Sequence, residues 1–368
     1  MLSMLKSRII AYYLPQFHPT PENDKWWGKG FTEWTNVGKA KPLFKNHDQP
    51  KLPADLGYYD LRIADVLKQQ VKMAQMHGIE GFCYWHYWFG NGKKLLEKPF
   101  QDHLKSDFNE IGFSLAWANI SWGGLDYGDK YQRLLMEQKY PGTQDYVNHF
   151  YELLPAFLDK RYLTINEKPI FTIYNPLGLP NSKEFISLWN DLAIKNGLKG
   201  IYFIAYQHLN FPYNDFGYDA LSPPSPGHLF LRVKYNIKEK IFQKITGFKY
   251  NQLKYRTLKL RNLYTHKQIV DASDYSDIST EIKFFPSCSP NWDHTPRSGY
   301  KGQVIVDTNP ELFYKNLQNC YSRIKNYDIE EKIIFIKAWN EWAEGNYLEP
   351  DQKVGFNNLL QIKKFQEI

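Results

Sequence analysis

The stretch "KIIFIKAWNEWAEG", residues 332–345, is an apolar run that passes directly into a group of acids and tryptophans. It continues to Pro350, so that residues 339–350 hold three carboxylates and two tryptophans. A charge beside a buried strand is costly unless it is paired or used. The stretch therefore predicts a strand that delivers Glu341 and Glu344 to a site. Glu349 lies beyond Tyr347 and is expected at the rim or in the loop before the last helix.

Seven further apolar runs precede this strand, and amphipathic patterns with helical spacing lie between them. Strands are predicted at 8–14, 81–89, 113–120, 169–175, 201–207, 219–224, 283–289 and 332–340. The clearest helices are predicted at 61–78, 143–160, 181–197, 309–326 and 356–368. Eight strands that alternate with helices predict an α/β fold, a (β/α)8 TIM barrel formed by residues 1–368 as one domain. The rival, a doubly wound open sheet, lacks its G-x-G-x-x-G turn after the first strand.

Two segments are additions to the eight strand–helix units of a barrel. They are a long loop at 15–57 after strand one and an insertion at 225–267 after strand six. The chain carries +7, but eleven Lys or Arg against one acid give residues 231–267 a charge of +10 and leave −3 for the rest. The insertion fits a solvated helical hairpin, a docking face for anionic lipid headgroups, or a receptor for the phosphates of a donor. Peripheral contact with the inner face of a membrane through residues 231–267 is accordingly a possibility to test, and no motif points to nucleic acid.

Aromatic residues make up 17% of the chain, with 11 Trp, 27 Tyr and 24 Phe. Such a surplus suits a groove for sugar rings, nucleobases or a protein partner, although an aromatic-rich core fits the composition equally well. Three distant cysteines argue against a disulfide framework and favour a reducing compartment. With no secretory signal pattern at the start and no run of ~18 apolar residues, the sequence predicts a cytoplasmic protein.

Reactive groups of a barrel lie where its strands end. Polar and aromatic residues recur at these positions, among them Gln16, Trp85, His86, Trp88, Trp122, Gln207, His208, His294 and Arg297. The substrate-binding candidates chosen from the strand ends and loops are His18, Trp34, Tyr84, Trp117, Asn119, Tyr174, Trp292, Asp293, Trp339 and Asn340. For the tryptophans of strand two a pure core role is an alternative, and Glu33 and Trp34 fit a lid packed on the barrel.

Glu341 and Glu344 are the catalytic candidates. Breaking or transferring a glycosidic bond needs one carboxylic acid near the bridging oxygen and one carboxylate near the ring carbon. Two nearby carboxyls raise the pKa of one of them, which supplies an acid and a base at one pH. The alternative is that both acids merely cap the last helix. No H-E-x-x-H or G-x-S-x-G pattern is present, so the sequence predicts no metal and no cofactor.

Six segments, taken together, resemble the WbsX-like family. They are "YYLPQFHPTPENDKWWGKGFTEWTNVGKAKPLF", "LGYYDLR", "GIEGFCYWHYWF", "WANISW", "NWDHTPR" and "AWNEWAEGNYLEPD". These bacterial surface-polysaccharide proteins are often called glycosyltransferases and are related to glycoside hydrolase family 99 endo-mannosidases. The resemblance covers Ile9 to Asp351 and implies a (β/α)8 barrel that acts on glycosidic bonds with retention. It departs from the family pattern at Trp85-His86, Asn291 and His294, which bears on the choice of sugar.

The resemblance also implies roles for the acids. Glu341 would assist at the 2-hydroxyl of the sugar, forming a 1,2-anhydro intermediate, and Glu344 would be acid and then base at the bridging oxygen. Trp339, Asn340 and Trp342 would shape the floor of the site.

The function predicted is a retaining enzyme of surface-polysaccharide metabolism, such as O-antigen, capsule or lipopolysaccharide biosynthesis. Its predicted substrate is an oligosaccharide or polysaccharide, lipid-linked glycans included. A nucleotide-sugar-dependent glycosyltransferase is one rival, but it would show a nucleotide-binding half and often a D-x-D motif. A non-catalytic glycan-binding barrel is the other, and it would have no use for paired acids.

Overall fold

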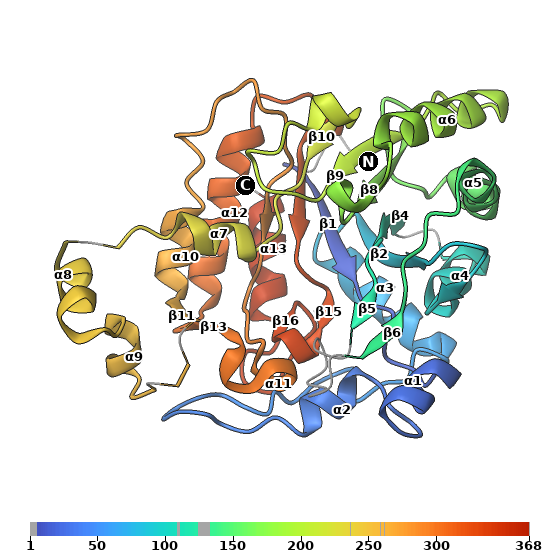
Figure 1. Cartoon of the computed structure of the whole chain (residues 1–368). Coiled ribbons are helices and arrows are strands. Elements are labelled where there is room, and N and C mark those ends of the chain that lie inside the picture. Colours follow the sequence, from blue (N-terminus) through green and yellow to red (C-terminus); the bar gives the residue numbers. More distant parts are fainter. Residues whose placement is uncertain are drawn as a thin grey trace.

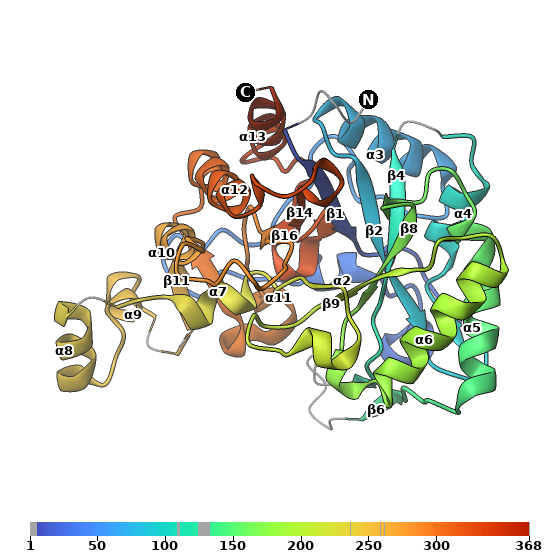
Figure 2. The ribbon, with the colours of Figure 1, turned by 90° about the horizontal axis from the view of Figure 1, so that it is seen from above.

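The computed structural model describes residues 6–108, 111–123, 133–235, 237–257, 259–260 and 262–367. Its centre is a curled sheet with helices around it (Figures 1 and 2). Eight strands run parallel in this sheet: β1 (Arg8–Tyr13), β2 (Gly81–Trp88), β4 (Gly112–Trp117), β8 (Lys168–Ile173), β9 (Tyr202–Ala205), β10 (Ala220–Leu221), β12 (Ser287–Cys288) and β14 (Ile333–Ile336).

The strand order is β10-β9-β8-β4-β2-β1-β14-β12. Leu221 of β10 forms a parallel bridge with Phe284, three residues before β12, and so joins the two edges. The amide of Phe285 donates to the carbonyl of Leu221 at 2.9 Å, and the amide of Leu221 donates to the carbonyl of Lys283 at 3.1 Å. Each of the eight strands overlaps a predicted one, which confirms the strands of the (β/α)8 prediction.

The five clearest predicted helices are also present: α3 (Ala64–Met76), α5 (Thr143–Phe157), α6 (Ser182–Lys195), α12 (Pro310–Ile324) and α13 (Asn357–Gln366). α4 (Lys98–Lys105) lies between β2 and β4. Their apolar faces pack on the strands, whose side chains are buried on both surfaces because helices cover the outside and side chains fill the inside.

The chain between β1 and α3 contains α1 (Pro21–Trp27) and α2 (Glu33–Gly38). It follows the end of the barrel to which the strands point (Figure 1). Backbone hydrogen bonds fix this segment to the loop before α13. The amide of Ala54 donates to the carbonyl of Pro350 at 2.9 Å, and the amide of Gln352 donates to the carbonyl of Leu52 at 3.0 Å.

After β10 the chain forms α7 (Gly227–Arg232), α8 (Ile237–Thr246), α9 (Tyr250–Lys254), β11 (Asn262–Thr265) and α10 (His266–Ala272). β11 pairs with β13 (Gln303–Val306) in a separate parallel ribbon. α8 and α9 lie at the periphery in both views (Figures 1 and 2). None of the described helices is long and apolar enough to cross a membrane.

Candidate active site

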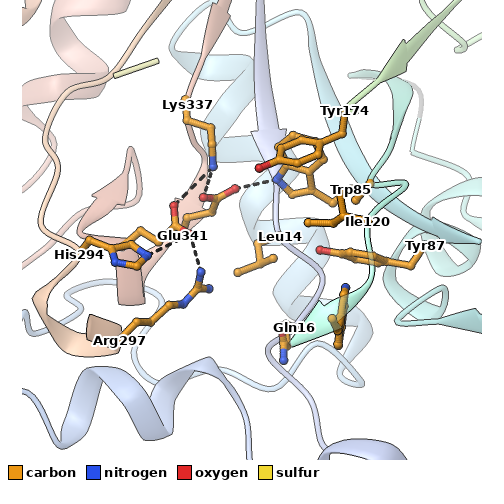
Figure 3. A pocket seen from close by; sticks show the side chains of 13 residues that line it. Leu14, Gln16, Trp85, Tyr87, Ile120, Tyr174, His294, Arg297, Lys337 and Glu341 are labelled. Carbon is orange, nitrogen blue, oxygen red and sulfur yellow. Dashed lines mark hydrogen bonds and ion pairs between the residues drawn. The ribbon is translucent and has the colours of Figure 1, made fainter. Parts of the chain in front are cut away.

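A cavity of about 290 Å³ opens where the parallel strands end, and Glu341 and Glu344 line it. Glu341 belongs to the short strand β15 (Asn340–Glu341), which pairs with β16 (Asn346–Tyr347), and Glu344 ends the 3-10 turn η7 (Trp342–Glu344) between them. Figure 3 shows their surroundings. The other lining residues are Leu14, Gln16, Trp85, Tyr87, Ala118, Ile120, Trp122, Tyr174, His294, Arg297 and Lys337.

The Glu341 carboxyl is buried, with 3% of the residue exposed. The indole of Trp85 donates to its Oε1 at 2.7 Å, and the ammonium of Lys337 contacts its Oε2. Burial raises the pKa of Glu341 to about 7; Lys337 opposes this rise and the neighbouring Glu344 adds to it. At neutral pH this carboxyl therefore exchanges a proton readily.

Two cations and one histidine lie around the Glu344 carboxyl. Arg297 pairs with its Oε1, Lys337 Nζ lies 3.6 Å from its Oε2, and His294 Nε2 lies 3.9 Å from its Oε1. Burial opposes ionisation, but these neighbours, Lys337 first, outweigh burial and lower the pKa of Glu344 well below its usual value. The site thus holds one carboxylate and one carboxyl that is partly protonated at pH 7.

The roles that the resemblance implies require the proton on Glu344 at the start of a reaction, whereas here Glu341 is the carboxyl that holds it. A group that protonates a bridging oxygen must carry a proton, whereas Glu344 is the more acidic of the two. Lys337 contacts both carboxyls, and each carboxyl shifts the pKa of the other. The pair therefore titrates as a unit, and a change in its cationic contacts redistributes the proton.

Aromatic rings form the wall of the cavity next to Glu341. The Trp85 ring stacks on the Tyr12 ring, with 4.8 Å between their centroids. It lies at a steep angle to the Tyr174 ring, with 5.5 Å between centroids. Lys337 Nζ lies 5.4 Å from the centre of the Trp85 ring, so the cation contacts both the acids and the wall. Flat apolar faces next to charged hydrogen-bonding groups suit the two kinds of surface that a sugar ring presents.

Of the ten substrate-binding candidates, only Tyr174 lines this cavity. Tyr84, Trp117 and Trp339 are buried elsewhere. Tyr84 points outward to α4, where its hydroxyl lies 2.9 Å from His103 Nδ1, and the Trp117 indole donates to the carbonyl of Trp88. On β2 the alternation of side chains sends Tyr84 outward and its neighbour Trp85 into the cavity.

Asn119 and Asn340 hold backbone near the cavity. Asn119 Oδ1 accepts from the amide of Asn175, and its Nδ2 donates to the carbonyl of the same residue. Asn340 forms the same double contact with Leu14, at 2.8 and 3.0 Å. In this structure both asparagines fix the strand ends from which Tyr174 and Leu14 reach the cavity.

Two other candidates belong to the loop after β1 and do not line the cavity. His18 is 5% exposed, and burial lowers its pKa. The indole of Trp34 donates to the carbonyl of Tyr59 at 2.8 Å, and its ring packs on Trp342 at 5.4 Å. Trp34 thereby fastens the loop to η7.

Trp292 and Asp293 line a second cavity of about 240 Å³, beside the first. Asp293 Oδ2 lies 2.7 Å from His47 Nε2 and accepts from Gln49 at 2.7 Å. Its amide donates to the carbonyl of Glu344 at 2.8 Å. Asp293 therefore connects the long loop to the turn that carries Glu344.

Lys337, Leu14 and Tyr87 line the cavity but are not predicted from the sequence. A lysine inside the apolar run "KIIFIKA", four residues before Glu341, was the available signal, because a buried ammonium needs a carboxylate partner. Five polar or aromatic residues at predicted strand ends also line the cavity, although they are not among the ten substrate-binding candidates: Gln16, Trp85, Trp122, His294 and Arg297.

Arg297 also contacts Glu33 of α2, with 2.9 Å between Arg297 Nη2 and Glu33 Oε1. Glu33 is fully buried, and this burial raises its pKa although Arg297 opposes the rise. Glu349, the third acid, does not line the cavity; it accepts from Tyr59, Gln70 and Trp342 at 2.6–2.9 Å. Across the described residues, no group of three or more His, Cys, Asp and Glu is placed to hold a metal ion.

The sequence model of the family "Glycosyltransferase WbsX" matches residues 9–362. The chain belongs to the glycosyltransferase WbsX family. Two curated relatives, both "Uncharacterized protein WxcX", come from Xanthomonas campestris pv. campestris strains ATCC 33913 and B100 and are 33% identical over 356 and 364 residues. The matches cover 96% of the chain but 48% of each relative, so the chain spans about half their length.

Solved structures with the same fold include a "glycoside hydrolase-like protein", with a TM-score of 0.62, 14% identity, and coverage of 98% of this chain and 94% of that one. A GH99 endo-alpha-mannosidase from Bacteroides thetaiotaomicron, solved with bis-tris propane, has a TM-score of 0.54 and 14% identity, covering 97% and 95%. At such identities the likeness shows the fold, and it confirms that this WbsX-family chain resembles the family 99 proteins in architecture.

Proposed function

We propose that this WbsX-family chain is a retaining carbohydrate-active enzyme that cleaves or transfers glycosidic bonds of bacterial surface polysaccharide, with Glu341 and Glu344 as its catalytic pair. The observation that carries the proposal is one buried cation, Lys337, shared by two carboxyls of opposite pKa shift in an aromatic-walled cavity. Paired acids of unlike pKa are the requirement for acid–base work at one pH. The family name and the fold of the structural relatives support the same class.

In the proposed reaction, a sugar ring lies on Trp85 and Tyr174 with its scissile bond above the acids. One carboxyl gives a proton to the bridging oxygen while the other carboxylate assists at the ring, and water or a sugar hydroxyl completes the exchange. The roles that the resemblance implies give Glu344 the bridging oxygen. To act there, Glu344 has to receive the proton that Glu341 holds before the substrate binds. In this proposal the proton passes as the substrate displaces part of the contact between Glu344 and Arg297.

The substrate that we propose is an oligosaccharide of O-antigen or capsule type, carried on a lipid. The protein is incubated with the lipid-linked oligosaccharide of the organism that carries the gene and, separately, with the released glycan. Products are followed by mass spectrometry, and the anomeric configuration of the first product by NMR. Cleavage or transfer with retention is expected, whereas turnover that needs an added nucleotide sugar would favour the nucleotide-sugar-dependent rival.

Glu341→Gln and Glu344→Gln are each expected to lower turnover by about 10²–10⁴-fold, the usual contribution of a positioned acid or base. Glu349→Gln is the matched control, because this glutamate is buried in the same segment but lies outside the cavity. Turnover that persists in both single variants would refute the catalytic assignment. Glycan binding without turnover in the parent protein would favour the binding barrel.

The acid is identified with glycosyl fluorides, whose leaving group needs no proton. A panel of α- and β-hexosyl fluorides is screened by fluoride release. The variant that lacks the acid is expected to retain most of its activity on the fluoride, and the variant that lacks the other carboxylate to lose it. Equal losses on the fluoride and the glycan in both variants would contradict a division of roles.

A further inference from the structure

Helix α8 (Ile237–Thr246) buries none of its ten residues. It packs on α9, with the Phe242 and Tyr250 rings 5.9 Å apart, and lies away from the sheet in both ribbon views (Figures 1 and 2). A helix on a globular protein normally buries one apolar stripe against the core. An apolar stripe on α8 would therefore have no partner within the described part of the chain.

Such a stripe exists. Ile237, Ile241 and Ile245 follow one another at four-residue spacing and are 75%, 53% and 78% exposed. At 3.6 residues per turn they span about 80° of the helix circumference. We call these three side chains the isoleucine row. A contiguous exposed apolar row of this kind marks a contact surface for a partner or a membrane.

Lysines border the isoleucine row on both sides. Lys238 lies about 20° beyond Ile245, and Lys244 and Lys240 lie about 20° and 60° before Ile237. All three are exposed. Other lysines of the insertion have partners, such as Lys254 with Asp307, but no described residue forms an ion pair with Lys238, Lys240 or Lys244.

The one acid of the helix, Glu239, lies on the far side, about 160° from Ile241. The row therefore faces outward with one lysine on one side and two on the other, and the negative charge faces away. This is the arrangement of helices that lie in the plane of a membrane interface, with the apolar stripe among the acyl chains and lysines at the phosphates.

We propose that α8 docks the protein on the surface of an anionic lipid bilayer. The isoleucine row enters the boundary between headgroups and acyl chains, and Lys238, Lys240 and Lys244 contact the lipid phosphates. The excess of +10 over residues 231–267 adds long-range attraction to an anionic surface. This surface depends on neither carboxyl of the candidate active site, so it can fail or hold independently of the proposed function.

Other occupants match only part of this surface. Nucleic acid would use the lysines but has no use for three exposed isoleucines. A second copy of the chain would bring the same positive charge to the same face and be repelled. A bilayer with anionic headgroups satisfies both the apolar and the charged side chains.

The test is flotation of the full chain with vesicles of phosphatidylcholine alone or with 30% phosphatidylglycerol. Binding to the anionic vesicles is expected to exceed binding to neutral ones by about tenfold or more and to fall when salt is raised to about 0.5 M. The variants I237S/I241S/I245S and K238Q/K240Q/K244Q are each expected to lose about tenfold in affinity for anionic vesicles.

The control variants replace exposed isoleucines and lysines that lie outside α8. Ile63, Ile194 and Ile329 are 56%, 62% and 44% exposed, and I63S/I194S/I329S matches the isoleucine row. K72Q/K183Q/K195Q removes three exposed lysines of α3 and α6. Both controls are expected to bind as the parent does. No binding of the parent to anionic vesicles, or equal losses in control and α8 variants, would overturn the proposal.

Discussion

Lys337 determines the charge of the candidate active site. It is 8% exposed, and its ammonium contacts Glu341 and approaches Glu344 and the Trp85 ring. Two buried carboxyls without a cation would repel each other, and at least one would take up a proton. This lysine therefore decides how many protons the pair holds at neutral pH.

Lys337→Met removes that cation while keeping a side chain of similar length. The pKa of both carboxyls is expected to rise, so the acid limb of the pH–activity profile moves to higher pH and activity at pH 7 falls by about 10²-fold. The profile is measured by fluoride release or by product formation. Lys325→Met, an exposed lysine of another segment, is expected to leave the profile unchanged. A Lys337→Met profile that superimposes on the parent would contradict this role.

Glu349 makes stability depend on pH. Burial raises its pKa from 4.5 to about 7, although hydrogen bonds from Trp342, Gln70 and Tyr59 lower it. Between these two values the folded chain binds more protons than the unfolded chain, so this group stabilises the fold below pH 4.5 and loses that contribution as pH rises to about 7. At ~1.4 kcal/mol per pKa unit, the loss amounts to about 3 kcal/mol.

In Glu349→Gln that titration is absent. The fall in the free energy of unfolding between pH 5 and pH 8 is expected to be smaller than in the parent by about 3 kcal/mol at most. Urea unfolding at a series of pH values measures it. Parallel stability curves for the two proteins would show that Glu349 is ionised throughout this range.

The turn η7 sets the position of Glu344 at the scale of the element. Gly345 closes this turn with a φ of +56°, and a Cβ there would lie 2.7 Å from the backbone nitrogen and Cβ of Asp293. The glycine thus meets two requirements at once, a left-handed backbone and close contact with the loop after β12.

Gly345→Ala is expected to destabilise the fold by about 2 kcal/mol or more, from backbone strain and the steric clash, and to displace Glu344. Gly355 is the matched control, since its φ is +58° but a Cβ there meets nothing within 4 Å. Gly355→Ala is expected to cost only about 1 kcal/mol. Thermal unfolding compares the two, and equal losses would show that contact with Asp293 is unimportant.

At the scale of the whole molecule, the loop after β1 is fastened to the ends of the last strands. Glu33 pairs with Arg297, and His47 and Gln49 contact Asp293. Asp293 remains ionised although it is buried, because hydrogen bonds from His47, Thr295 and Gln49 outweigh burial and lower its pKa. The loop after β1, the loop after β12 and Glu344 therefore form one connected unit.

Asp293→Asn keeps the shape of the side chain but removes its charge and one acceptor. Faster hydrogen exchange is expected at residues 44–51, by about tenfold or more, because the loop loses its buried anchor. Asp48→Asn is the control: Asp48 lies in the same loop, but its side chain is 36% exposed and its pairing with Lys51 contributes little. Unchanged exchange in Asp293→Asn would contradict the anchoring role.

The sequence alone determined the places of the eight strands, the WbsX family and the two acids at the end of the last strand. These signals are local: apolar periodicity and short motifs remain readable without knowledge of packing. The tertiary structure alone decided that the Trp85 and Tyr87 rings of "YWHYW" enter the cavity, because the period of two is visible in sequence but its phase depends on which surface the helices cover. It also decided that Lys337, Arg297 and Glu33 share the site with Glu341 and Glu344, since these charges come from distant segments and meet only through the curl of the sheet.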